Sequence, residues 1–452
     1  MYQLPPSAET RLGALLGAEA DRFAASHPRS AQCHARAAQS LLNGVPMNWM
    51  EKWPGAYPIV AERAEGARLW DVDGNEYVDL CLGDTGAMAG HCPPPTVRAL
   101  AEQIQRGWTT MLPSPDAARA GELLAERFGL PIWQIVMTAT DANRFILRLA
   151  RWLTDRQRIL VFNWCYHGTV DETMAVLVDG EVRPREGVVA GAFAPAQTTT
   201  VVEFNDLEAI ERELASGEIA CVLAEPALTN IGIVLPDPGF HTALRELTRR
   251  TGTLLVLDET HTFSTGPGGA TKAWGLDPDL MVIGKTIAGG FPAAAYGMTA
   301  PIAQRVSEAV REPGLNLSGI GGTLSGNALA VAAIVATLGE YFTPGQFEEM
   351  TRNASRWSTG VQQQAEHAGF EFHVSQLGAR AEYHLGRPSR NGGAAAVAGH
   401  EPLENYLHLF ALNRGVLLTP FHNMALMSPV TTPADVDRHT EVFAEALGCL
   451  TR

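Results

Sequence analysis

The stretch DLMVIGKTIAGG, residues 279–290, joins a short apolar run to a lysine and a glycine pair. The run LMVI predicts a buried strand, and Lys285 stands at its carboxyl end. The letters GKT suggest a phosphate-binding P-loop, but that motif requires a glycine five residues before Gly284, where Asp279 stands. The lysine therefore needs a different explanation, which the rest of the chain has to supply.

The composition disfavours several classes of function. The chain has 452 residues and a net charge of −15, so we expect no binding to nucleic acid or to anionic membrane surfaces. No run of 18 apolar residues is present, and the stretch MYQLPPSAETRLG lacks the basic and apolar regions of a signal peptide. The six cysteines lack disulfide or metal-site spacing, so we expect reduced thiols, no metal and a cytoplasmic protein.

From about residue 95 the sequence alternates helical segments with short apolar strands. The expected strands are WQIVMT, RILVFN, IACVLAEP, TLLVLDE and DLMVIGK, and helical patterns such as DANRFILRLARWLTD and GFHTALRELTRRTG lie among them. This alternation predicts a mostly parallel sheet covered on both faces, with its site at the carboxyl ends of the strands. Outside this region, ARLWDVDGNEYVDL predicts a hairpin, and LGARAEYHLG and RGVLLTP predict strands of a second domain.

Two of the expected strand ends carry a lysine and a carboxylate. A lysine desolvated at a strand end can act as an amine nucleophile towards a carbonyl, and Lys285 has that position. Asp258 ends the preceding strand. Together they suit pyridoxal phosphate, because the lysine forms a Schiff base and the aspartate keeps the pyridine nitrogen protonated. A structural ion pair between two strand ends would explain the same two residues.

A third strand end carries small and hydroxyl-bearing residues. The letters TATD, residues 138–141, stand where a strand turns into a helix. Backbone N–H groups at the start of a helix bind phosphate, and Thr138 and Thr140 add hydroxyl donors. Ordinary capping of the helix by Thr140 or Asp141 would explain the same residues without a ligand.

Five motifs occur in an order that is typical of one enzyme family: AYPIVAERAEGARLWDVDGNEYVDL, VFNWCYHGTVDE, TLLVLDE, DPDLMVIGKTIAGGFPAAAYG and GGTLSGNALA. From about residue 40 to residue 340 the chain resembles the class III aminotransferases of pyridoxal-phosphate fold type I, near the glutamate-1-semialdehyde aminomutase branch. The resemblance implies an α/β fold with a mostly parallel seven-stranded sheet in a large domain at 91–335. It also implies a smaller α+β domain formed by residues 1–90 and 336–452.

The resemblance assigns roles around the cofactor ring. It implies that Lys285 is the Schiff-base lysine and proton shuttle, that Asp258 pairs with the pyridine nitrogen, and that Tyr166 stacks on the ring. Glu225 would belong to the hydrogen-bond network around Asp258 and the cofactor oxygen. Without the family, Tyr166 and Glu225 would be read as residues that support the fold.

The resemblance also indicates which residues bind the cofactor phosphate. Backbone N–H groups of Ala139 and Thr140 would bind it, and Thr323 would reach the phosphate of a partner subunit. This implies a homodimer with shared active sites. Ala139 stands where the family usually has glycine, and an alanine there narrows the accessible backbone angles.

His261 is a departure from the family pattern, because relatives carry methionine or glutamine after the corresponding aspartate motif. A histidine there would hydrogen-bond near the cofactor's phenolic oxygen. A ring satisfied by backbone groups is the alternative explanation.

The residues expected to contact the substrate differ further from the family pattern. Met50, beside Trp49, stands where relatives that use amino acids carry a carboxylate-binding arginine, and a methionine cannot bind a carboxylate in that way. Asp84 aligns with a pocket residue of relatives, where it would favour a cationic or hydroxylated substrate; a turn-capping role is the alternative. We therefore expect an aminotransferase that moves an amino group from an amine or amino acid to a keto or aldehyde acceptor. The alternative is an intramolecular aminomutase or a racemase on the same scaffold.

Overall fold

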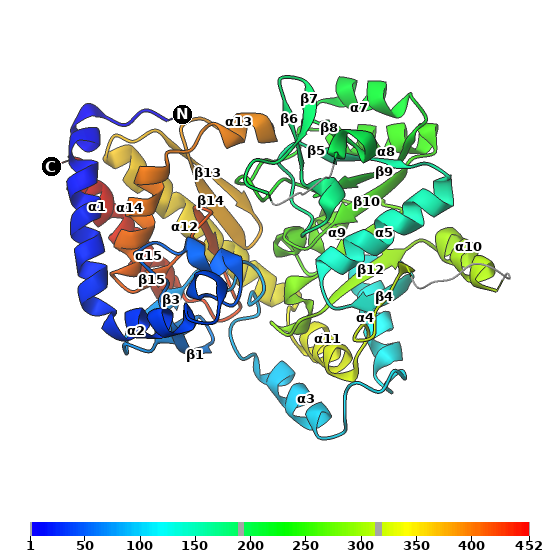
Figure 1. Cartoon of the computed structure of the whole chain (residues 1–452), viewed down its shortest axis with the longest axis horizontal. Helices are drawn as coiled ribbons and strands as arrows, with labels where there is room; N and C mark the ends of the chain where they lie inside the picture. The colour runs from blue at the N-terminus through cyan, green and yellow to red at the C-terminus, as the bar shows by residue number, and fades with distance from the viewer. Residues whose placement is uncertain (1, 189–193, 312–318, 452) are drawn as a thin grey trace. The chain divides into compact units, whose positions relative to one another are not determined.

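The structure is a computed structural model that describes residues 2–188, 194–311 and 319–451 (Figure 1). The chain forms two compact units. The large unit consists of residues 94–344 and 389–396. The small unit consists of residues 1–93, 345–388 and 397–452.

The large unit contains a seven-stranded sheet (Figure 1). In spatial order its strands are β4 (Ile132–Val136), β12 (Ala294–Met298), β11 (Leu280–Ile283), β10 (Leu254–Asp258), β9 (Ile219–Ala224), β5 (Arg158–Phe162) and β8 (Thr199–Val202). Neighbouring strands from β11 to β8 run parallel, whereas β12 is antiparallel to both β11 and β4. The expected mostly parallel α/β sheet is confirmed, and it includes two strands, β8 and β12, that the sequence pattern did not indicate.

Burial explains why these segments form the centre of the sheet. Every residue of β9 and β11 is buried, as parallel strands covered by helices require. The helix α5 (Ala139–Thr154) packs on β9, β11 and β12, and α8 (Phe240–Thr251) packs on β10. Both helices have buried apolar residues at helical spacing, so the sheet and its helices share one core.

The large unit contains further described helices and a hairpin. Its further helices are α3 (Pro94–Ile104), α4 (Ala117–Phe128), α6 (Pro195–Thr198), α7 (Leu207–Leu214), α9 (Gly269–Ala273), α10 (Ala300–Val310), α11 (Ala328–Glu340) and α13 (Gly392–Ala396). A separate hairpin is formed by β6 (Ala175–Val178) and β7 (Glu181–Pro184).

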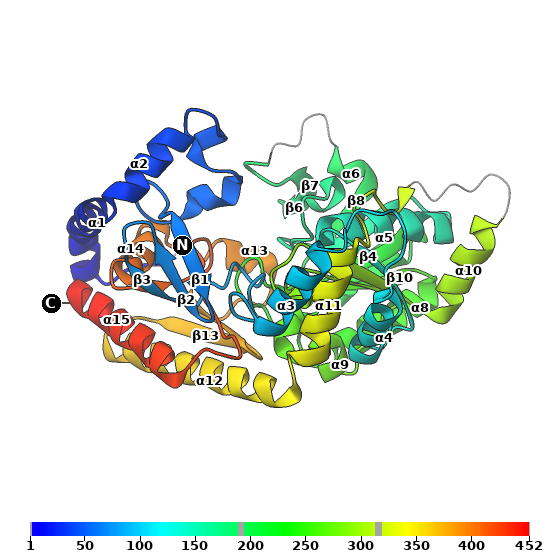
Figure 2. The ribbon, with the colours of Figure 1, turned by 90° about the horizontal axis from the view of Figure 1, so that it is seen from below.

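The small unit contains two short sheets with helices packed around them (Figure 2). One sheet has the order β1 (Ala61–Glu65), β2 (Arg68–Asp71), β3 (Glu76–Asp79) and β15 (Val416–Leu417). The other has the order β13 (Phe372–Leu377), β14 (Arg380–Leu385) and β16 (Met424–Leu426). Its helices are α1 (Pro6–Ser26), α2 (Pro28–Ala37), α12 (Pro344–His367), α14 (Glu401–Leu412) and α15 (Pro433–Thr451). The expected β2–β3 hairpin and the strands β14 and β15 are confirmed.

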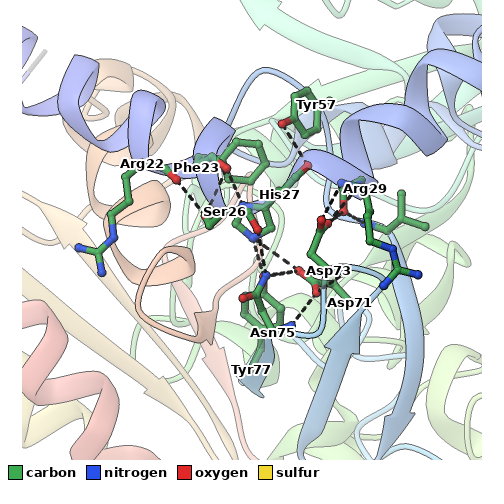
Figure 3. Close-up of polar contacts among 12 residues, drawn as sticks. Arg22, Phe23, Ser26, His27, Arg29, Tyr57, Asp71, Asp73, Asn75 and Tyr77 are labelled. Atoms are coloured by element: carbon green, nitrogen blue, oxygen red, sulfur yellow. Dashed lines mark hydrogen bonds and ion pairs between the residues drawn. The ribbon is translucent and has the colours of Figure 1, made fainter.

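A buried polar network joins the helices α1 and α2 to the β2–β3 hairpin (Figure 3). His27 lies between the two helices, with Nε2 at 2.8 Å from Tyr77 Oη and Nδ1 at 2.8 Å from the carbonyl oxygen of Phe23. Tyr77 in turn donates to Asp71 Oδ2 at 2.7 Å. Because His27, Tyr77 and Asp71 are all buried, each of these groups needs its partner inside the protein.

Asp73, in the turn of the same hairpin, caps α2. Its carboxylate accepts the backbone N–H groups of Arg29 at 2.7 Å and Ser30 at 2.9 Å, and the hydroxyl of Ser30 at 2.6 Å (Figure 3). The carboxylate thus satisfies N–H groups that the first turn of a helix leaves without intrahelical partners.

Within the described residues, no single helix has both the length and the apolar character needed to cross a membrane; the successive helices α11 and α12 meet that requirement only jointly, across a break.

Asp73→Ala should lower the free energy of unfolding by about 1–2 kcal/mol, because α2 loses its cap. Burial raises the pKa of Asp73, but the hydrogen bonds from Ser30 and Arg29 outweigh burial and lower it. The contribution of the cap is therefore present above about pH 4 and is lost as the pH falls through the lowered pKa. Urea unfolding of the wild type and the variant should show a difference at neutral pH that shrinks in acid. Asp73→Asn is the control, and an equal difference at both pH values would contradict the capping role.

Candidate active site

The candidate catalytic side chains of the large unit lie where neighbouring strands end. Asp258 is the last residue of β10, Glu225 directly follows β9, and Lys285 is the second residue after the end of β11. In the parallel register Asp258 pairs with Val282 of β11, and β9 lies on the other side of β10. Parallel strands end at the same edge of a sheet, so the register brings these residues to one place, as the sequence predicts.

Asp258 is a buried carboxylate with several donors around it. Its side chain is 4% exposed, and its two oxygens accept hydrogen bonds from Asn143 Nδ2 at 2.9 Å, His167 Nδ1 at 3.0 Å and the backbone N–H of Thr260 at 3.1 Å. Burial raises the pKa of Asp258, but the hydrogen bond and positive charge of His167 outweigh burial and lower it. The carboxylate therefore stays ionised inside the protein.

His167 carries the matching positive charge. Burial lowers the pKa of this histidine, but the neighbouring Cys165 and Asp258 side chains outweigh burial and raise it well above the ordinary value. Because a protonated imidazole donates through Nδ1, His167 and Asp258 form a buried ion pair.

Lys285 adopts an uncommon backbone conformation. Its φ is +52°, in the left-handed region that costs a side-chain-bearing residue about 1–2 kcal/mol. The short 3₁₀ turn Lys285–Ala288 begins at this residue, and Gly284 separates it from β11. The Nζ atom of Lys285 lies 2.5 Å from His261 Nε2. Strain of this kind collects at functional sites, where the surrounding structure holds it in place.

His261 is linked to side chains on both of its ring nitrogens. Beyond the contact with Lys285, its Nδ1 lies 2.8 Å from Thr229 Oγ1, and Thr229 donates to Glu225 Oε2. The alternative explanation from the sequence, a histidine ring satisfied by backbone groups, is therefore wrong. The ring connects Lys285 to the buried carboxylate of Glu225, an arrangement that the sequence did not indicate.

The turn at residues 138–141 is capped by a different residue from those expected. The residue that caps α5 is Thr138, whose hydroxyl accepts the Asp141 N–H at 3.1 Å and donates to Asp141 Oδ2 at 2.9 Å. Capping by Thr140 or Asp141 is therefore wrong. Ala139 and Thr140 are the first two residues of α5, at the end where helix N–H groups point outward.

Thr140 is used in a contact with a neighbouring loop. Its Oγ1 accepts the backbone N–H of Thr169 at 3.1 Å. The approach is close, because a Cβ added to Gly168 would lie 2.1 Å from Thr140 Oγ1. Gly168 also has a φ of +76°, so both space and backbone geometry require glycine there. This contact fixes the loop after β5 against the start of α5.

The chemistry of these groups fits pyridoxal 5'-phosphate. An ionised buried carboxylate suits a protonated pyridine nitrogen, a lysine amine suits the aldehyde carbon, and the outward N–H groups of a helix start suit the phosphate. Asp258, Lys285 and the start of α5 provide these three features within one compact unit.

Comparison with known proteins agrees with this chemistry. Residues 49–447 match the family described as Aminotransferase class-III. The chain belongs to the class III aminotransferases. It is accordingly a pyridoxal-phosphate-dependent enzyme of that family, and the expected fold type is confirmed.

Similar class III aminotransferases include named aminomutases and transaminases. A glutamate-1-semialdehyde 2,1-aminomutase from Desulforudis audaxviator is 35% identical over 433 residues, covering 93% of this chain and 98% of the relative. A glutamate-1-semialdehyde aminomutase of Pseudomonas aeruginosa, crystallised as a lysine-to-alanine variant with PMP, is 47% identical with a TM-score of 0.95, covering 98% and 99% of the two chains. An omega-transaminase from Sphaerobacter thermophilus is 27% identical with a TM-score of 0.85, covering 93% and 97%.

The predicted substrate residues lie in the other unit of this class III aminotransferase. Met50 lines a cavity of about 390 Å³ within the small unit, and the Trp49 ring packs 5.1 Å from the ring of Phe421. Asp84 lies in a segment, 82–85, in which all four residues have positive φ. The roles of Trp49, Met50 and Asp84 towards the substrate stay predictions.

Tyr166 and Thr323, predicted to contact the cofactor ring and the partner's phosphate, both lie in the large unit. The backbone N–H of Tyr166 donates to Glu225 Oε1 at 3.4 Å. Thr323 is exposed and lines a pocket of about 210 Å³ with residues 108–113. The roles of these two residues also stay predictions.

Sequence reasoning overlooked two residues and gave a third no role. Asn143 is fully buried in α5 and donates to Asp258, and Thr229 links His261 to Glu225. His167 stands in the quoted motif VFNWCYHGTVDE, but its pairing with Asp258 was not predicted. A signal for Asn143 exists in hindsight, because an asparagine on the apolar face of a helix needs a polar partner. Thr229 lies in a loop and offers no such signal.

His167→Ala should destabilise the cofactor-free protein by about 3–5 kcal/mol, because it leaves the charge of Asp258 buried without its partner. His167→Asn is the matched control, since its amide can still donate to Asp258 and should lose less. Denaturant unfolding of the three proteins measures the difference.

The pH dependence of this difference has two limits. The raised pKa of His167 makes its contribution fully present below about pH 6.5 and lost as the pH rises through that raised value. The lowered pKa of Asp258 makes its contribution present above about pH 3.9 and lost as the pH falls through the lowered value. The gap between wild type and His167→Ala should be widest between these limits, and a gap independent of pH would argue against an ion pair.

Proposed function

We propose that this chain moves an amino group on carbonyl substrates with pyridoxal 5'-phosphate, and that Lys285 is the residue that binds the cofactor covalently. The observation that carries the proposal is the position of Lys285 at a strand end beside the ionised Asp258. The ordinary alternative, a structural ion pair between these two residues, is less favoured because Asp258 already has His167 as its charged partner at 3.0 Å.

Each residue of the strand ends has a defined task in this proposal. Bound pyridoxal phosphate supplies an electron-accepting ring to a substrate amine. Asp258 holds the proton of the pyridine nitrogen, and His167 keeps Asp258 ionised. Lys285 takes up a proton from the substrate carbon and returns it to a different atom. Tyr166 covers the ring face.

The phosphate end has its own residues. The N–H groups of Ala139 and Thr140 bind the phosphate, where the positive end of the α5 dipole favours an anion. Thr138 is occupied by capping, so its hydroxyl contributes to the shape of the turn rather than to the phosphate.

Between the two forms of amino transfer, the comparisons favour an intramolecular aminomutase. The named aminomutases are 35% and 47% identical to this chain over almost its whole length, whereas the omega-transaminase is 27% identical. We therefore place the aminomutase reaction first, in which the amino group returns to a different carbon of the same substrate.

An intermolecular aminotransferase is the second candidate. It is favoured by Met50, which stands where the family resemblance implies an arginine for the substrate carboxylate. An apolar residue there suits an amine or ketone without that carboxylate.

We further propose that the enzyme is a homodimer in which Thr323 reaches the cofactor phosphate of the partner. Support comes from an exposed apolar patch around Thr323 on the large unit, formed by Trp108, Met111, Leu112 and Leu324, which are 43%, 74%, 74% and 50% exposed. Contiguous exposed apolar groups of this kind mark protein interfaces.

Borohydride reduction of the cofactor-loaded protein should attach the cofactor to the peptide that contains Lys285. Lys285→Ala should lose turnover by several orders of magnitude, because the variant lacks both the nucleophile and the proton shuttle. Mass spectrometry of the digested protein locates the label. The exposed Lys272, also in the large unit, is the matched control for substitution, and label on any lysine other than Lys285 would overturn the assignment.

The two forms of the reaction are separated by an isotope experiment. Glutamate-1-semialdehyde labelled with ¹⁵N should be converted into the isomer with its amino group on carbon 1, and the label should stay on that product when an unlabelled keto acid is present. Transfer of the label to the keto acid, or activity on arylalkylamines alone, would favour the intermolecular form. Absence of amino transfer with glutamate-1-semialdehyde, the keto acid and the arylalkylamines would contradict the proposed function.

Leu112→Glu should shift the protein from dimer to monomer, because it places a charge in the proposed interface. Leu235→Glu is the control, since Leu235 is 45% exposed in the large unit but lies outside the patch. Light scattering after gel filtration measures the mass. Thr323→Ala should keep the dimer but weaken cofactor retention by about 1–3 kcal/mol, the typical loss of a hydrogen bond to a charged group. A monomeric wild type would refute the proposed dimer.

A further inference from the structure

Four side chains of the large unit form a continuous hydrogen-bond chain that ends on Lys285. Glu225 accepts the hydroxyl of Thr229, Thr229 Oγ1 lies 2.8 Å from His261 Nδ1, and His261 Nε2 lies 2.5 Å from Lys285 Nζ. Glu225, Thr229 and His261 are 3%, 0% and 8% exposed, so bulk water does not compete for these bonds.

With Glu225 ionised, the order of donors along this chain fixes one tautomer of His261. A carboxylate only accepts hydrogen bonds, so the single proton of the Thr229 hydroxyl points to Glu225. The hydroxyl oxygen then accepts, and His261 Nδ1 must carry the proton that it accepts. In the neutral ring the other nitrogen, Nε2, is therefore unprotonated and accepts a hydrogen bond from an N–H of Lys285.

This order of donors requires an ionised Glu225, and three hydrogen-bond donors converge on its two oxygens. Burial and the charge of Asp258 raise the pKa of Glu225, and His167, Thr229 and the backbone of Tyr166 reduce that rise without cancelling it. Oε2 also accepts the Thr229 N–H at 3.1 Å, and Oε1 accepts the Tyr166 N–H at 3.4 Å. In a protonated Glu225, Oε2 would donate to Thr229 Oγ1 and the Thr229 hydroxyl would donate to His261 Nδ1; an Nε2–H form of His261 in the measurement below corresponds to that state.

We propose that Thr229 and Glu225 are positioning residues that hold His261 in its Nδ1–H tautomer, so that His261 Nε2 accepts a hydrogen bond from Lys285. The proposal rests on the proposed role of Lys285 and goes beyond it, because it assigns a function to two residues that do not touch the reacting amine. It also assigns the hydrogen bond of His261 Nε2 to Lys285 rather than to the phenolic oxygen of the cofactor.

The consequence concerns the orientation of the Lys285 amine. When its amine takes a proton from the substrate, the resulting ammonium donates to the bare Nε2, and a hydrogen bond with a charged donor is stronger than a neutral one. The proton stays on Nζ, and no bond to His261 is made or broken. The chain therefore holds one N–H of Lys285 in a fixed direction.

The tautomer of His261 can be measured directly on the cofactor-free protein. Long-range ¹H–¹⁵N spectra of protein labelled with ¹⁵N-histidine distinguish Nδ1–H, Nε2–H and imidazolium forms, and the signals that His261→Gln removes identify the ring. The wild type should show the Nδ1–H form at neutral pH. Thr229→Val, which keeps the shape but removes the acceptor, should lose that form, and Thr229→Ser should restore it.

Thr286→Val is the matched control for a buried threonine. Thr286 is fully buried next to Lys285, and within the described part of the chain its hydroxyl has no hydrogen-bond partner. The control should leave the His261 tautomer unchanged. An Nε2–H or imidazolium form in the wild type, or an Nδ1–H form that persists in Thr229→Val, would overturn the proposal.

Kinetics of the cofactor-bound enzyme provide a second test of this proposal. Thr229→Val should lower kcat about tenfold, which corresponds to about 1.4 kcal/mol, and should raise the isotope effect of a deuterium on the substrate α-carbon. Cofactor affinity should stay the same, and Thr229→Ser should recover most of the rate. If no amino-transfer substrate is found, the proposed function fails while the tautomer measurement still decides this inference.

Discussion

The site depends on keeping one carboxylate ionised inside the core. Asp258 is 4% exposed, and a charge at that depth is costly unless it is paired and hydrogen-bonded. The pairing comes from three different parts of the chain: Asn143 from α5, His167 from the loop after β5, and the backbone of Thr260 after β10. The electrostatics that suit the cofactor therefore exist only when the central sheet, α5 and the loop after β5 are assembled.

The sequence was sufficient for the fold class and for most strands of the large sheet, because continuous apolar runs such as those of β9 and β11 are a direct consequence of burial on both faces. It was insufficient for β8 and β12. The letters TTVV of β8 include polar threonines, and AAYGM of β12 has a glycine and two alanines with weak strand preference. Pairing with already buried neighbours, rather than local preference, makes these segments strands.

The candidate site shows the same division between local and tertiary information. Lysine and aspartate at strand ends were predictable, since residue type and position along the chain are local facts. The cap of α5 by Thr138 and the contacts of His261 were not, because each depends on which side chain lies nearest after folding. The left-handed φ of Lys285 was equally hidden, since nothing in the letters GKT requires it.

The contact of Gly168 with Thr140 has a consequence for how this region can change over time or in a directed-evolution library. With 2.1 Å between a hypothetical Cβ and the threonine oxygen, a side chain at position 168 requires a smaller residue at position 140 or a displaced loop. The two positions belong to different segments, yet neither can be altered freely without regard to the other. Randomising residues 138–141 alone would therefore sample mostly the residues that Gly168 already permits, whereas randomising position 168 together with them would open new shapes of this turn.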